Sequence, residues 1–151
     1  MCYSGLRETN ALDSIKTITR MDVKSKLSAV WLFAVLNYLY ADVVALYDPT
    51  FLRQLMTGAV GSVQFTQGLL LVISAEVEIP IAMVLLSRIL KSRTNRWANI
   101  VAGIVMTVVQ VSTLFVGTPT LYYVFFSVLE ICSTLFIVWY AWRWHPTRDE
   151  P

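Results

Sequence analysis

The chain has 151 residues, a length that favours a single domain, and its net charge of +2 carries little information because the charges are unevenly distributed along it. Hydrophobic residues make up 56% of the chain and charged residues 15%, whereas soluble domains average about 45–50% apolar and about 25% charged residues. This composition is typical of a membrane protein and argues against a soluble globular one. The two cysteines, Cys2 and Cys132, lie far apart and indicate neither a disulfide framework nor a metal site.

Residues 1–26 form a mixed, polar segment that we interpret as a cytoplasmic tail. It lacks the basic, apolar and small-residue succession of a signal peptide, so no cleavable leader is expected. Met21 is followed at once by charged residues and then by the first apolar run. One hypothesis is that Met21 is the native start, or that residues 1–20 are dispensable; loss of membrane insertion on deleting residues 1–20 would contradict it.

Four apolar runs follow, each close to the roughly 20 residues that a helix needs to cross a bilayer core of about 30 Å. They cover residues 27–47, 66–87, 98–116 and 121–142. Because a backbone in lipid must satisfy its own hydrogen bonds, these runs are predicted to be helices. The sequence thus predicts an all-α integral membrane protein, an antiparallel four-helix bundle over residues 27–144, with residues 145–151 as a second cytoplasmic tail.

The loop between the first two runs begins with Asp48 and Pro49, a capping residue followed by proline at the first helical position. Apolar residues then recur at helical spacing, which predicts a short interfacial helix over residues 49–57. It would be either an ordinary capped loop helix or a lid over an outward-opening cavity. Residues 117–120 read as a tight turn between the last two runs.

The basic residues predict the orientation. Eleven of the twelve Lys and Arg residues precede the first run, lie between the second and third, or follow the fourth, and Arg53 alone lies on the other side. The positive-inside rule therefore places both termini in the cytoplasm, with the protein in the cell membrane. Tryptophans, Trp31 among them, fall near the predicted cytoplasmic ends and suggest an aromatic belt.

Inside the four runs there are four acidic residues and no Lys, Arg or His. An ionisable residue in a span costs about 2.5–3.5 kcal/mol on insertion scales and usually marks a functional site in the bundle interior. Acids gathered without a cation are suited to holding protons, a cation or a hydrogen-bonding ligand. We predict a polar site near mid-membrane. Its candidate residues are Glu78, Glu130, Asp42, Gln110, Asn37 and Glu76.

A helical wheel separates the two glutamates of the second run. Glu78 shares a face with small and polar residues, which predicts that it faces the bundle interior, whereas Glu76 lies about 160° away on a face that looks lipid-exposed. Pro80 cannot donate a hydrogen bond to the carbonyl of Glu76, so a helix bend is expected there.

The third and fourth runs each carry a stripe of polar and small residues at helical spacing. These are Asn99, Gly103, Met106, Gln110, Thr113 and Gly117 in the third, and Tyr123, Ser127, Glu130, Thr134 and Ala141 in the fourth. Such stripes also occur as plain packing surfaces between membrane helices. A purely structural role for these side chains, including a protonated Glu78 or Glu130 with one hydrogen bond, therefore stays open.

No catalytic motif is present: there is no phosphate-binding glycine loop, no nucleophile elbow and no cysteine–histidine pair, and His145 is the only histidine. No catalytic residue and no metal site can be named. The sequence favours a non-enzymatic protein without deciding the point. No nucleic-acid partner is expected, because the basic residues flank the spans; the expected partners are the bilayer and either a second copy or a membrane complex.

Four segments resemble a family of small four-span prokaryotic membrane proteins that carries only a domain-of-unknown-function label. They are NYLYADVVALYDP (37–49), EIPIAMVLLSR (78–88), NRWANIVAGI (95–104) and GTPTLYYVFFSVLEICSTLFIVWYAW (117–142). The family is similar in architecture to DoxX-like membrane proteins, whose link to quinone-coupled oxidation is an analogy of fold alone.

Three functions are compatible with these features. The first is the handling of protons or a small solute at the mid-membrane carboxylates. The second is an accessory or scaffold subunit without chemistry. The third, implied by the DoxX-like architecture, is an oxidoreductase subunit that binds a quinone or a lipid; otherwise no cofactor is predicted.

Overall fold

The computed structural model describes the backbone of residues 2–115 and 119–145, and the side chains of these ranges from residue 22 onward. Within them the regular elements are helices and one small hairpin. The elements are α1 (Cys2–Ala45), α2 (Pro49–Met56), β1 (Ala59–Val60), β2 (Val63–Gln64), α3 (Gln67–Ile89), α4 (Ser92–Thr113) and α5 (Leu121–Arg143).

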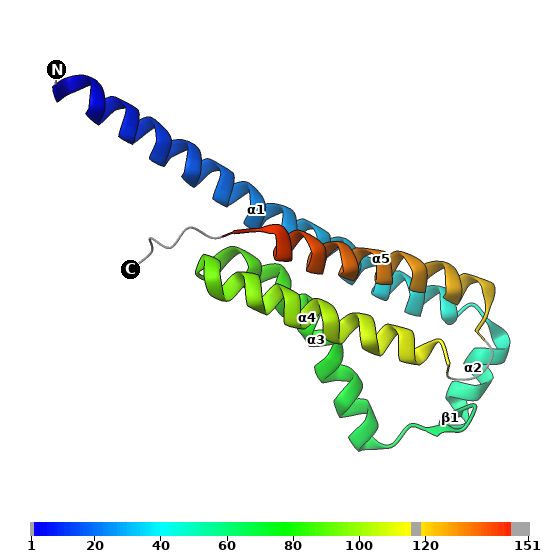
Figure 1. Ribbon diagram of the computed structural model, residues 1–151. Helices are drawn as coiled ribbons and strands as arrows, with labels where there is room; N and C mark the ends of the chain where they lie inside the picture. Colours follow the sequence, from blue (N-terminus) through cyan, green and yellow to red (C-terminus); the bar gives the residue numbers. More distant parts are fainter. Residues whose placement is uncertain (1, 116–118, 146–151) are drawn as a thin grey trace.

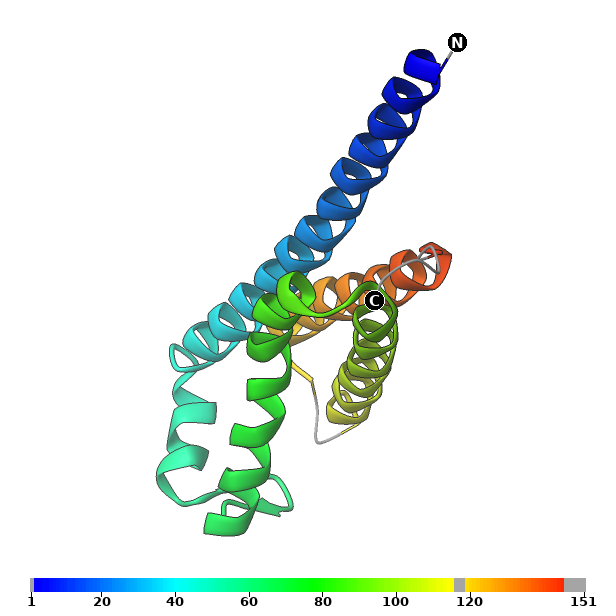
Figure 2. The same cartoon turned by 90° about the vertical axis from the view of Figure 1, so that its left-hand side faces the viewer.

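The long helices pack against one another in pairs (Figure 1). α4 packs along α5, and α1 packs against both α3 and α5, whereas α3 and α4 make a smaller contact. The core lies where these helices meet, around Leu27, Trp31, Met106 and Ile137. The N-terminal part of α1 continues as a single helix beyond the bundle (Figure 2), so the segment predicted as a polar tail is helical from Cys2.

Three helical segments are long and apolar enough to cross a membrane: Asp22–Ala45, Gln67–Ile89 and Leu121–Arg143. These correspond to the first, second and fourth predicted spans. α4 is outside this set because it takes in Arg93 and Arg96 at its start and carries a buried polar stripe, both of which lower its mean hydropathy. The all-helical class and three membrane-compatible helices are therefore established.

The predicted basic loop between the second and third spans is wrong in extent. α3 continues to Ile89 and α4 begins at Ser92, so only two residues lie between them. Asn95 N donates to Lys91 O at 2.8 Å, and the Asn95 side chain donates to Ser87 O at 2.6 Å, which ties the first turn of α4 back onto α3. Of the turn predicted over residues 117–120, Gly117 and Thr118 lie outside the described residues.

The short helix predicted after Asp48 is confirmed as α2. Asp48 Oδ1 accepts hydrogen bonds from the backbone N–H groups of Thr50 at 2.9 Å and Phe51 at 3.3 Å, as an N-cap should. No residue of α2 is buried. The hairpin that follows was not predicted: Ala59 pairs with Gln64 and Val60 with Val63, and Gly61 opens its two-residue turn with φ of 57°.

α3 changes direction near its middle, where its upper half packs into the bundle and its lower half diverges (Figure 1). Pro80 is the proline inside this helix, and it is buried together with Met83 and Ser87. A proline removes one backbone hydrogen bond of the helix and clashes with the preceding turn, which accounts for a bend of this kind.

Candidate functional site: the buried polar seam

A ladder of side-chain hydrogen bonds joins α4 to α5. Tyr123 Oη donates to Thr113 Oγ1 at 2.6 Å, and Gln110 Nε2 donates to Ser127 Oγ at 2.9 Å. One turn further, the hydroxyls of Thr107 and Thr134 lie 2.8 Å apart. Hydroxyl and amide groups in a bundle interior are satisfied across the helix interface in this way.

Most described members of the two predicted stripes are buried. On α4 the buried members are Asn99, Gly103, Met106 and Gln110. On α5 they are Ser127, Glu130, Thr134 and Ala141. Thr113 and Tyr123 are half-buried at the end of the seam, and Gly117 lies outside the described residues.

Glu130 lies on the buried face of α5, between the two rungs made by Ser127 and Thr134. Its side chain is 1% exposed, and its Oε1 atom is buried without a hydrogen-bond partner. Burying a carboxylate oxygen without a partner is unfavourable by several kcal/mol, so such an atom calls for an explanation.

Two residues of α1 approach Glu130. Tyr38 and Asp42 are both close enough to interact with it electrostatically. Tyr38 is half-buried, and its hydroxyl oxygen is itself buried without a partner. Tyr38 also interacts with Glu76 of α3, and Tyr123 interacts with both Glu130 and Asp42.

The expected orientation of the two α3 glutamates is wrong. Glu78 is exposed and Glu76 is half-buried. The reason is the packing of α3: the face that enters the bundle carries Pro80, Met83 and Ser87, and Glu76 precedes them on that same face at a spacing of four. On the face that carries Glu78, Ser74 and Ala75 are exposed as well.

The remaining candidates are placed as follows. Asp42 is exposed, and Asn37 is half-buried with its amide bonded to Phe33 O of its own helix at 2.8 Å. Gln110 belongs to the seam through Ser127. Among the side chains that the structure describes, no group of three or more His, Cys, Asp or Glu could hold a metal ion.

A second polar network lies nearer the α3–α4 junction and was missed by sequence reasoning. Asn99 Oδ1 accepts from Trp31 Nε1 at 2.7 Å and from Ser87 Oγ at 3.2 Å, while Asn99 Nδ2 donates to Asn95 Oδ1 at 2.6 Å. All four side chains have 0% exposure. Trp31 is therefore a core residue of this network, and its assignment to the aromatic belt is wrong.

The i, i+4 spacing of Asn95 and Asn99 is the signal that could have revealed this network, because it places two amides on one helix face. The network joins α1, α3 and α4 through saturated hydrogen bonds. Its side-chain amide and indole groups already have hydrogen-bond partners within the protein, whereas the buried oxygens of Glu130 and Tyr38 have none. The Asn95–Asn99 network joins three helices, whereas the region around Glu130 leaves two buried oxygen atoms without a hydrogen-bond partner.

These features define an all-helical protein with three helices that could span a membrane and a buried polar seam between α4 and α5. The chain belongs to a family of unknown function, DUF6326, whose sequence profile matches residues 18–150. No curated protein and no solved structure matches the chain. The resemblance to a domain-of-unknown-function family is thereby confirmed, whereas nothing links the chain to DoxX-like proteins.

Proposed function

We propose that the chain is a four-span protein of the cell membrane with both termini in the cytoplasm. α4 serves as the fourth span: its 22 residues make a helix about 33 Å long, enough for a hydrocarbon core of about 30 Å. Its pairing with α5 shields its polar stripe from lipid. The distribution of Lys and Arg supports the orientation.

Reporter fusions at the C-terminus and in the loop around Gly61 test this topology. We expect a cytoplasm-dependent fluorescent reporter to be active at the C-terminus, and an export-dependent phosphatase to be active only when inserted in the loop around Gly61. Phosphatase activity at the C-terminus would contradict the proposed orientation.

Within this bundle we propose that Glu130 binds an exchangeable proton and that the protein handles protons across the membrane. The observation that carries the proposal is the Oε1 atom of Glu130, which is buried near the middle of α5 without a partner. Burying a carboxyl group in this position costs less free energy in the protonated form than in the charged form. We therefore expect Glu130 to hold a proton. The four predicted spans offer it no Lys, Arg or His.

The neighbours of Glu130 support a route for the proton. Tyr38 presents a second unpartnered oxygen, and Asp42 lies one turn further along α1, toward the end of that helix that the proposed topology places outside. Asp42 is exposed, so it can exchange protons with the surroundings and pass them toward Glu130, with which it interacts. Glu76, which interacts with Tyr38, would alter the proton affinity of the groups around Glu130.

The proposal is tested in liposomes loaded with a pH-sensitive dye and containing the purified protein, with a potassium diffusion potential as the driving force. We expect wild-type protein to acidify the lumen faster than empty liposomes do. Glu130→Gln keeps the shape of the side chain but cannot release a proton, so it should reduce the rate at least about tenfold, the loss expected when an essential acid–base group is removed.

Glu78→Gln is the matched control, because it makes the same chemical change on the exposed surface of the same bundle. It should leave the rate unchanged. The infrared band of a protonated carboxyl group at neutral pH should be present in the wild type and reduced in Glu130→Gln. Equal rates for wild type and Glu130→Gln, or no rate above empty liposomes, would refute proton transfer through Glu130.

A further inference from the structure

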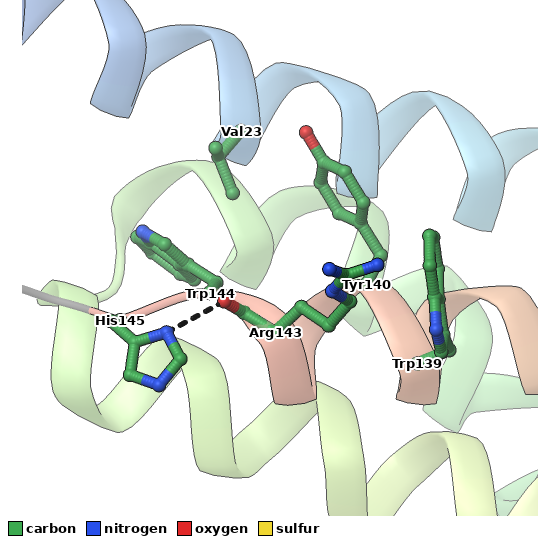
Figure 3. A pocket seen from close by; sticks show the side chains of 6 residues that line it. All are labelled: Val23, Trp139, Tyr140, Arg143, Trp144 and His145. Atoms are coloured by element: carbon green, nitrogen blue, oxygen red, sulfur yellow. Dashed lines mark hydrogen bonds between the residues drawn. The ribbon is translucent and has the colours of Figure 1, made fainter.

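A surface pocket lies at the C-terminal end of α5, beside α1 (Figure 3). It has a volume of about 320 Å³, at the lower end of the roughly 300–1,000 Å³ range of ligand sites. Its lining consists of aromatic and basic side chains with one aliphatic residue: Val23, Trp139, Tyr140, Arg143, Trp144 and His145.

Arg143 is held above the Trp139 ring, with its guanidinium carbon 5.3 Å from the ring centroid. A guanidinium can stack on an aromatic face and still present its N–H donors in the plane of the group. His145 Nδ1 lies 2.8 Å from the backbone oxygen of Arg143, which fixes the imidazole beside it (Figure 3). The pocket therefore offers a positioned, planar set of donors of the kind that recognises a phosphate group.

The charges around the pocket are predominantly basic. Lys26 and Asp22 of α1 form an ion pair at 2.5 Å, so together they add no net charge beside the pocket. Arg96 Nη2 donates to the backbone oxygen of Trp142 at 3.2 Å, which brings another cation to the same end of α5. An anion in the pocket would thus meet excess positive charge.

An apolar surface leads away from the pocket along α5. The Phe136 ring stacks on Tyr140 at 5.7 Å and lies 5.9 Å from Trp139, and Phe136 is 44% exposed. α5 is one of the helices apolar enough to cross a membrane, so its exposed rings face acyl chains in a bilayer. The basic residues come directly after this apolar stretch, at the depth where lipid phosphates lie.

We propose that this pocket binds the phosphodiester headgroup of an anionic phospholipid. Arg143 contacts the phosphate, Trp139 and Trp144 pack on the glycerol region, and the acyl chains follow the surface around Phe136. A free phosphate ion would use the same donors but would gain nothing from this apolar surface. The site is distinct from the seam around Glu130 and does not depend on proton handling.

The test is the thermal unfolding midpoint of the purified protein in neutral detergent, titrated with phosphatidylglycerol, with phosphatidylcholine of the same acyl chains, or with inorganic phosphate. We expect phosphatidylglycerol to raise the unfolding midpoint until the site is saturated. Phosphatidylcholine and inorganic phosphate should leave the midpoint unchanged. Arg143→Gln should weaken the apparent affinity for phosphatidylglycerol about tenfold, equivalent to about 1.4 kcal/mol.

Arg93→Gln is the control, because it removes one exposed positive charge from α4 outside the pocket. It should bind phosphatidylglycerol as the wild type does. If Arg143→Gln does not yield folded protein, Trp139→Leu provides a second variant at a half-exposed position, with an expected loss of several-fold. Equal responses to the two lipids, an equal response to inorganic phosphate, wild-type binding by Arg143→Gln, or an equal loss in Arg93→Gln would each overturn the proposal.

Discussion

Replacing Asn99 by leucine is expected to lower the free energy of unfolding by about 2–4 kcal/mol, because it strands buried donors on two other helices. The indole N–H of Trp31 and the hydroxyl of Ser87 both donate to Asn99 Oδ1. Neither side chain has solvent exposure, so water cannot replace the lost acceptor. Denaturant titration of the purified protein in micelles, followed by helical circular dichroism, measures the loss.

Asn37→Leu is the matched control for this prediction. The Asn37 amide bonds only within its own helix, to Phe33 O, and the site is half-buried. Its replacement should cost less than about 0.5 kcal/mol, below the average of about 0.6 kcal/mol for a hydrogen bond between membrane helices, because no other helix loses a partner. The stability losses of Trp31→Phe and Asn99→Leu should be strongly non-additive, because both substitutions remove the same Trp31–Asn99 hydrogen bond. Additive losses, or equal losses for the two asparagines, would show that the network does not hold α1 to α4.

The helices themselves follow from local patterns that the sequence displays. A run of apolar residues with a polar stripe at spacings of three and four predicted the α4–α5 interface, and Gln110, Ser127 and Glu130 are buried there as expected. The start of α2 was predictable because Asp48 and Pro49 act locally, through one cap and one fixed φ angle. Features of this kind need no knowledge of neighbouring helices.

The failures have one physical cause, which is that the sequence does not say which helix lies beside which face. A wheel ranks faces by polarity, so it assigned Glu78 to the interior; the structure gives α3 a large contact only with α1, through the face of Glu76 and Pro80. Trp31 looked interfacial by position, yet its indole N–H finds an acceptor 68 residues away in Asn99. Tyr38 was visible in the sequence, but only the approach of α1 to α5 brings it to Glu130.

The close approach of α4 and α5 at Gly103 predicts the second large effect on the free energy of unfolding. A methyl group at Gly103 would lie 2.7 Å from Val138 Cγ2 and 3.3 Å from the backbone oxygen of Thr134. The first distance is too short for two carbon atoms, so either the Val138 side chain must rotate or α4 and α5 must separate. Separation would also stretch the Thr107–Thr134 contact one turn away. Gly103→Ala should therefore cost about 1–3 kcal/mol from overpacking, in spite of a helix-propensity gain of about 1 kcal/mol.

Two further variants decide whether close packing is the cause. Gly68→Ala makes the same change in α3, where the nearest atom to the new methyl is Thr66 Oγ1 at 3.9 Å, so it should be neutral or stabilising by up to about 1 kcal/mol. Adding Val138→Ala to Gly103→Ala removes the clashing methyl and should restore part of the lost stability, although Val138→Ala alone should destabilise by creating a gap. The unfolding free energies of the wild type, Gly103→Ala, Val138→Ala and the double variant form a cycle. Two results would mean that α4 and α5 are not in contact at Gly103. One is a Gly103→Ala variant as stable as the wild type, and the other is a double variant that loses more stability than its two single variants lose together. The seam that buries Glu130 would then need a different register.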